Sequence, residues 1–119
     1  MTLPFYDKGF TQEEINFGLE KFVEGVNKMT AEHYRTKFPT LSPEHIVVNA
    51  RGRVYWKLIK QSIDGTGQKC VYAFVRKADG AILKAASWKA PALNHARGFV
   101  TDEDYGLCNA GVYGIRYMI

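Results

Sequence analysis

The fold is decided by the stretch Lys69–Trp88, which reads KCVYAFVRKADGAILKAASW. Two runs rich in apolar and aromatic residues flank Ala78-Asp79-Gly80, the clearest turn in the chain. Aspartate and glycine accept the backbone conformations that tight hairpin turns require. We therefore expect one strand over Lys69–Lys77 and a second, antiparallel to it, over Ala81–Trp88.

The residues before this hairpin extend the sheet. β-Branched residues predict a first strand over His45–Ala50, and Arg51-Gly52 is a tight turn into a second strand over Arg53–Ile63. After the hairpin we expect three short features: a helical turn over Ala92–Gly98, a polar loop over Thr101–Asn109 and a last strand over Gly111–Met118.

The N-terminal part of the chain predicts a helix. Thr11 and Glu14 form a capping-box pattern at its start. Apolar residues then recur at helical spacing and define one buried stripe, made of Ile15, Leu19, Phe22, Val26 and Met29. Gly18 and Gly25 lie beside the stripe and predict the close approach of another element. Thr30 is expected to break the helix and to cap a short second helix over Ala31–Phe38.

This order predicts an α+β fold, with an N-terminal helix and a short second helix packed on a four- to five-stranded antiparallel sheet. A length of 119 residues suits one domain over 1–119. In the core we expect Ile15, Leu19, Phe22 and Val26 to contact Val54, Leu58, Val71 and Val75.

Composition favours a soluble cytoplasmic protein. No apolar run approaches the ~18–20 residues of a membrane span, and the first residues lack the pattern of a signal peptide. Cys70 and Cys108 are too few for a disulfide framework and are expected to be reduced, buried thiols. The oligomeric state is left open.

Charge is concentrated in the middle of the chain. His45–Val100 carries ten basic and two acidic residues, net +8, in a chain of net charge +4. The flanking segments, 1–44 and 101–119, are each net −2. Such a block can attract a polyanion. The alternative is a solvated basic face that serves solubility.

Strand alternation sorts the side chains of this block into two faces. If the mainly aliphatic set faces the helix, the opposite face carries cations and aromatic rings, namely Arg53, Tyr55, Lys57, Tyr72, Phe74, Arg76, Lys84 and Trp88. Rings offer stacking surfaces to bases, and interleaved Lys and Arg neutralise phosphates. This pattern favours a module that binds single-stranded DNA or RNA with little sequence specificity. The alternative is a second core layer, with the cations at its rim.

Further cations follow the hairpin. Lys84, Lys89, His95 and Arg97 fall within the segment 83–98, which contains no acidic residue. Cations and backbone amides near a short helix start would suit a phosphate. The alternative is a structural corner that Trp88 anchors and Pro91 turns.

The sequence ADGAILKAASWKAPA over 78–92, preceded by Val71-Tyr72 and followed by Ala96-Arg97-Gly98, resembles a small protein family of tailed bacteriophages. Its core is the motif Ala-Ser-Trp-Lys-x-Pro-Ala, and the resemblance covers about a third of the chain. It implies a phage-encoded protein acting in the host cytoplasm and implies no activity.

No catalytic or metal motif stands out. His33, His45 and His95 are far apart, and none has a metal-ligand spacing. We therefore expect no catalytic residue, metal or cofactor, and a binding protein rather than an enzyme. The alternative to nucleic acid is a protein-interaction module, such as a host-factor inhibitor or a minor structural component, that docks on an acidic host protein.

Overall fold

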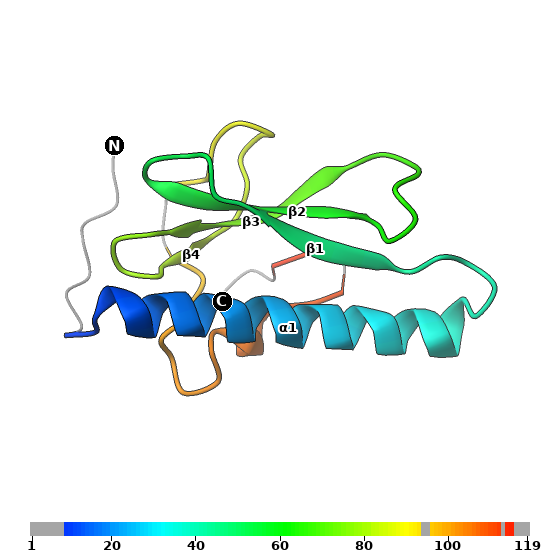
Figure 1. The fold of residues 1–119 in the computed structure, drawn as a ribbon, viewed down its shortest axis with the longest axis horizontal. Coiled ribbons are helices and arrows are strands. Elements are labelled where there is room, and N and C mark those ends of the chain that lie inside the picture. The colour runs from blue at the N-terminus through cyan, green and yellow to red at the C-terminus, as the bar shows by residue number, and fades with distance from the viewer. Residues whose placement is uncertain (1–8, 94–95, 113, 116–119) are drawn as a thin grey trace.

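One helix lies along one face of a four-stranded antiparallel sheet (Figure 1). The computed structural model describes residues 9–93, 96–112 and 114–115. The helix is α1 (Gln12–Lys37), and the strands, β1 (Glu44–Asn49), β2 (Tyr55–Ser62), β3 (Cys70–Arg76) and β4 (Ile82–Leu83), pair in chain order. A short 3-10 helix, η1 (Leu107–Asn109), follows. The expected α+β architecture is confirmed.

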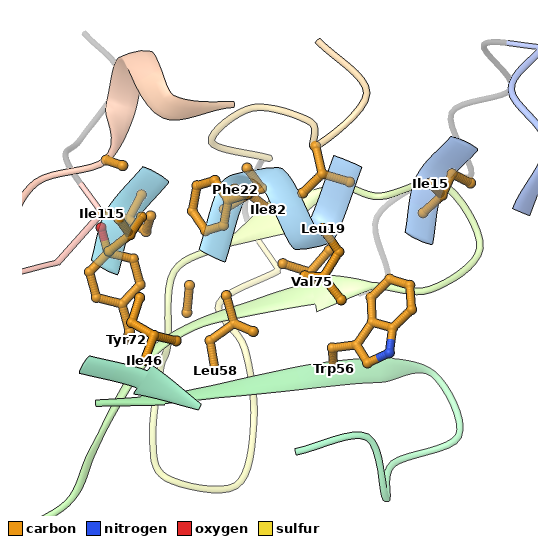
Figure 2. Close-up of a cluster of buried hydrophobic side chains, with 14 residues drawn as sticks. Ile15, Leu19, Phe22, Ile46, Trp56, Leu58, Tyr72, Val75, Ile82 and Ile115 are labelled. Carbon is orange, nitrogen blue, oxygen red and sulfur yellow. The ribbon is translucent and has the colours of Figure 1, made fainter. Parts of the chain in front are cut away.

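The start of α1 is fixed by the capping box that the sequence predicts. The backbone N–H of Glu14 donates to Thr11 Oγ1 at 3.2 Å, and the Thr11 N–H donates to Glu14 Oε1 at 3.0 Å. The predicted apolar stripe is buried at Ile15, Leu19, Phe22 and Val26. The side chains of Ile15, Leu19 and Phe22 point from α1 toward the sheet (Figure 2). Sequence periodicity therefore located both the start and the packed face of the helix.

The predicted break at Thr30 is wrong, because α1 is continuous over 26 residues. Thr30 is buried, and its hydroxyl donates to the Val26 carbonyl oxygen at 2.9 Å. A threonine inside a helix can satisfy its hydroxyl in this way instead of capping a new helix. The predicted second helix, Ala31–Phe38, is thus the last part of α1, which ends at Lys37 before Pro39.

The sheet side of the core differs from the prediction at two positions. Leu58 and Val75 are fully buried, as expected, and Trp56 joins them. Val54 precedes β2 and is 53% exposed, while Val71 is only half-buried. The place expected for Val71 is taken by Tyr72 (Figure 2).

A β-bulge explains this exchange. Leu58 opposes Ala73 and Ile59 opposes Val71, so Tyr72 is an extra residue in β3. A bulge interrupts the strict alternation of faces, and Tyr72 turns toward α1, where its ring centroid lies 6.4 Å from that of Phe22. Its hydroxyl donates to the Gly111 carbonyl oxygen at 2.7 Å. The prediction that Tyr72 lies on the outward face is therefore wrong.

The segment after β4 crosses the helix, as the two helical glycines predict (Figure 1). A Cβ atom on Gly18 would lie 2.2 Å from the Val100 carbonyl oxygen, and one on Gly25 would lie 2.6 Å from Leu107 Cδ1. The expected close approach is confirmed, and the segment that packs against both glycines is 99–107.

The predicted strand Ala81–Trp88 is much shorter, because β4 ends at Leu83. Residues 84–91 instead form a loop, which we call the 84–91 loop. In it the backbone N–H groups of Lys89 and Ala90 both donate to Ser87 Oγ at 3.2 Å, and such local serine bonds favour turns.

Two later predictions fail or fall partly outside the described residues. Residues 92–93 and 96–98 form no helix. Arg97 and Gly98 instead form backbone hydrogen bonds with Ile82 in β4, whose N–H donates to the Gly98 carbonyl oxygen at 2.8 Å. Of the expected last strand, 113 and 116–118 lie outside the description, and Ile115 pairs with Ala110 in an isolated bridge.

Both cysteines are free thiols, and both are exposed, so the expectation that they are buried is wrong. Partial desolvation and the neighbouring Asp104 carboxylate raise the pKa of the Cys108 thiol above its ordinary value. No helix among the residues that the structure describes is long and apolar enough to cross a membrane.

Candidate nucleic-acid interface

A groove of about 380 Å³ lies at one end of the sheet. It is lined by Asn49, Arg51, Gly52, Arg53, Val54, Tyr55, Lys57, Phe74 and Lys89. We call it the basic groove, because four of these nine residues are cationic and none is acidic. The cations come from three places in the chain: the β1–β2 turn, β2 and the 84–91 loop.

The floor of the basic groove is the face of the sheet that is turned away from α1. Lys57 lies directly opposite Phe74 across the β2–β3 ladder, so their side chains share this face. The Tyr55 ring meets the Phe74 ring edge to face, with 6.0 Å between centroids. Phe74 is only 4% exposed, whereas Tyr55 is half-buried. Figure 1 shows the 84–91 loop on this same side of the sheet.

The turn that carries Arg51 and Arg53 is tied to the end of β3 by one lysine. Lys77 Nζ donates to the carbonyl oxygens of Ala50, at 2.9 Å, and Gly52, at 2.7 Å. The Lys77 N–H also donates to the Val54 carbonyl oxygen at 2.9 Å. Lys77 thus occupies the backbone acceptors of the turn, while both arginines are exposed.

Trp88 borders the basic groove through Lys57. Lys57 Nζ lies 3.8 Å from the centroid of the indole ring, in a cation–π contact. Trp88 is 47% exposed, and the next residue, Lys89, lines the groove itself. The exposed indole and the groove cations therefore form one continuous surface.

The structure brings together six of the eleven predicted site residues. Arg53, Tyr55, Lys57, Phe74 and Lys89 line the groove, and Trp88 contacts Lys57. His95 lies outside the described residues. The other four lie elsewhere and are Tyr72, Arg76, Lys84 and Arg97.

Arg76 is on the correct face but is not available to a ligand. Its Nε donates to Asp79 Oδ1 at 3.0 Å and its Nη2 to Asp79 Oδ2 at 2.6 Å. Asp79 Oδ1 also accepts the Ala81 N–H at 3.1 Å, so the ion pair closes the hairpin turn. The arginine is 8% exposed and the aspartate 5%. The prediction that Arg76 binds phosphate is replaced by a structural role.

Lys84 and Arg97 are also misplaced in the prediction. Lys84 lines a separate hollow with Tyr72 and Gly114, because β4 ends before it. Arg97 is 2% exposed, and its N–H donates to the Ile82 carbonyl oxygen at 2.7 Å. Its burial fits the alternative that the segment forms a structural corner.

Arg51 is a groove residue that the sequence reasoning missed. The pattern predicts a turn at Arg51-Gly52 and no binding role for Arg51, although Arg51-Gly52-Arg53 places two arginines around one glycine. A short turn between paired strands projects its flanking side chains near the sheet end, and this signal could have added Arg51 to the site.

Another hollow, at the start of α1, has acidic residues in its lining and no cation. It measures about 320 Å³ and lies between Phe10, Phe17 and Tyr105, with Glu13 and Glu14 in its lining. A polyanion would be repelled there and attracted to the basic groove. Among the described residues, no group of three His, Cys, Asp or Glu is placed to hold a metal ion.

Comparison with known proteins gives a family and no activity. No curated protein and no solved structure matches the chain. The model of a family of unknown function, DUF7717, matches residues 8–117, which include α1, the whole sheet and the basic groove. The chain therefore belongs to this family of unknown function, DUF7717.

Proposed function

We propose that the protein binds single-stranded nucleic acid in the basic groove, with little sequence preference. The observation that carries this proposal is the gathering of Arg51, Arg53, Lys57 and Lys89 around one groove that has no acidic residue in its lining. Phosphate groups of a nucleic-acid backbone are the ligands that such a set of cations neutralises.

The groove is held in place before any ligand arrives. Lys77 fixes the turn that carries Arg51 and Arg53, and the β2–β3 ladder fixes the backbone of Lys57. Two arginines can each form bidentate hydrogen bonds with phosphate oxygens. A prearranged set of donors loses less conformational entropy on binding than a mobile one.

The rings at the groove favour a single strand over a duplex. Its walls include the half-buried Tyr55 ring and the apolar Val54, and Trp88 stands at its border. Unpaired bases can contact such rings, whereas the bases of a duplex are stacked inside it. Asn49, the amide in the lining, already accepts the Arg51 N–H through its Oδ1 at 3.0 Å. This arrangement supports weak base discrimination.

The proposal also gives a use to the motif that resembles tailed-phage proteins. The motif Ala-Ser-Trp-Lys-x-Pro-Ala forms most of the 84–91 loop, which brings Trp88 and Lys89 to the groove. On this proposal the protein is phage-encoded and meets its nucleic acid in the host cytoplasm.

A second candidate function is docking on an acidic protein through the same cations. The observation that favours it is the burial of Tyr72 and Phe74, which leaves fewer exposed rings for stacking than the sequence predicts. An acidic protein needs the cations and no stacking surface.

The experiment is fluorescence anisotropy with labelled dodecathymidylate and its uridine counterpart, at about 50 mM and about 200 mM salt. We expect binding to both strands, much tighter at low salt, and weaker binding to a duplex of equal length. Poly-L-glutamate, a polyanion without bases, serves as the competitor. If the protein binds poly-L-glutamate and binds neither strand at low salt, docking on an acidic protein replaces nucleic-acid binding as the proposed function.

A further inference from the structure

The contact between Lys57 and Trp88 occupies the surface that a base would use. Lys57 lines the basic groove, and its ammonium group lies 3.8 Å from the centroid of the Trp88 ring, so one face of the indole is covered by a cation of the groove. Trp88 is nevertheless 47% exposed, so a large part of the residue remains in contact with solvent. In the structure, therefore, the ring is present at the groove and is covered by a positive charge.

An unpaired base competes favourably for that ring face. Stacking of a base on an aromatic side chain contributes more to binding than a solvent-exposed cation–π contact does. The displaced ammonium group does not leave the site, because Lys57 is anchored in β2 opposite Phe74. It is released within the groove, where a phosphate group can receive it.

We propose that Trp88 is the base-stacking residue of the groove and that Lys57 is its gate, covering the ring when the groove is empty and moving to a phosphate when a base stacks. This inference rests on the proposed function. It assigns to each copy of the protein one stacked, unpaired nucleotide, with its base on Trp88 and its phosphates among Arg53, Lys57 and Lys89.

The size of the groove agrees with one nucleotide. A volume of about 380 Å³ is near the lower end of the range of about 300–1,000 Å³ for small-ligand sites. Phe74 is buried and Tyr55 is half-buried, so Trp88 is the most exposed ring at this surface. A run of stacked bases would need further exposed rings beside it.

The gate has an unusual consequence for salt dependence. Stacking by itself displaces no counterions, so base-bearing and base-free strands of equal charge should show equal salt slopes at an ordinary site. Here a stacked base frees Lys57 for one more phosphate. The log–log salt slope of the base-bearing strand should therefore be steeper by ~0.7, the value for one phosphate on a single strand.

The test compares tetrathymidylate with an abasic tetramer that has the same number of phosphates. We expect wild-type protein to bind tetrathymidylate about tenfold more tightly, the ratio of a single stacked base, with the steeper salt slope described above. Tryptophan emission should be quenched by tetrathymidylate and not by the abasic strand. Trp56 is buried in the core and serves as an internal reference that a ligand does not reach.

Two variants separate the roles of the gate and the ring. Trp88→Ala should abolish the preference for tetrathymidylate and, because no ring then holds Lys57, give both strands the same, steeper salt slope. Lys57→Met should equalise the two salt slopes while keeping the quenching, since the ring remains available to a base. Circular dichroism checks that each variant is folded. If Lys57→Met does not fold, Lys57→Arg takes its place, and it should keep the slope difference of the wild-type protein because it keeps the positive charge.

The outcomes distinguish this inference from the proposed function. Equal affinities and equal slopes for the two tetramers would overturn the gate, while strand binding through the cations would still stand. No binding of either tetramer or of dodecathymidylate at low salt would overturn the proposed function itself.

Discussion

Asn27 on α1 holds the backbone of Ile46 on the edge strand β1 with two hydrogen bonds. The Ile46 N–H donates to Asn27 Oδ1 at 2.6 Å, and Asn27 Nδ2 donates to the Ile46 carbonyl oxygen at 3.2 Å. β1 is the first strand in the sheet order, and no strand among the described residues pairs with its other side. The amide thus occupies peptide groups that an edge strand otherwise offers to another chain.

Replacing this amide should destabilise the protein. Asn27→Ala leaves a part-buried peptide donor and acceptor without their partner, at a cost of about 1–3 kcal/mol. Thermal unfolding measures the effect, and Asn16→Ala, which removes an exposed helix amide bonded only to Gln12 among the described residues, is the matched control. An Asn27→Ala variant as stable as the control would show that the edge contact contributes nothing.

At Gly18, where the 99–107 segment crosses α1, even the methyl group of alanine should destabilise the protein. Alanine normally stabilises a helix by about 1 kcal/mol relative to glycine. At Gly18 the new Cβ would overlap the Val100 carbonyl oxygen, a backbone atom, whereas at Gly25 it would meet the movable side chain of Leu107. We expect Gly18→Ala to lower the melting temperature and Gly25→Ala to lower it less. A Gly18→Ala protein that melts higher than wild type would contradict this packing.

Arg76 should matter for stability and not for binding. Removing one partner of a buried ion pair leaves the other charge uncompensated and costs about 3–5 kcal/mol. Arg76→Met should therefore lower the free energy of unfolding by about this amount, and the double variant with Asp79→Leu should recover part of it. At a temperature where Arg76→Met is folded, its salt slope with dodecathymidylate should equal that of wild type. A slope reduced by ~0.7 would return Arg76 to the list of phosphate contacts.

Lys77 should act on the basic groove without touching the ligand. Lys77→Met removes the two hydrogen bonds that hold the carbonyls of Ala50 and Gly52, each worth about 0.5–1.5 kcal/mol of stability. Because the turn that carries Arg51 and Arg53 then loses its anchor, strand affinity should fall. Lys69→Met, which removes an exposed cation just before β3, at the end of that strand far from the turn, is the control for the lost charge. Equal losses in both variants would mean that only net charge matters.

Local patterns in the sequence predict much of the fold. The spacing of Ile15, Leu19, Phe22 and Val26 fixes the buried face of α1, and the capping box fixes its start. Gly18 and Gly25 predict that another segment approaches α1 closely, but a glycine does not indicate which segment that is. Asn27 gave no signal, since its role depends on a strand that is distant in sequence.

The candidate site was predicted less completely, for reasons that lie in tertiary contacts. Alternation placed Tyr55, Lys57 and Phe74 correctly, but the bulge in β3 reversed the face of Tyr72. Charge counting treated all cations of the middle block alike. A count of charges does not show that Arg76 is paired with Asp79 or that Arg97 is buried.

The salt dependence of strand binding in two charge-matched variants tests the central proposal most directly. Arg53→Ala/Lys89→Ala removes two cations from the basic groove, and Lys28→Ala/Lys69→Ala removes two exposed cations outside its lining. Both variants have the same net charge. With dodecathymidylate, we expect the groove variant to bind more weakly and its log–log salt slope to be shallower by ~1.4, the value for two phosphate contacts. The control should match wild type, and equal slopes in both variants, or no binding by wild type at about 50 mM salt, would contradict a nucleic-acid site in the basic groove.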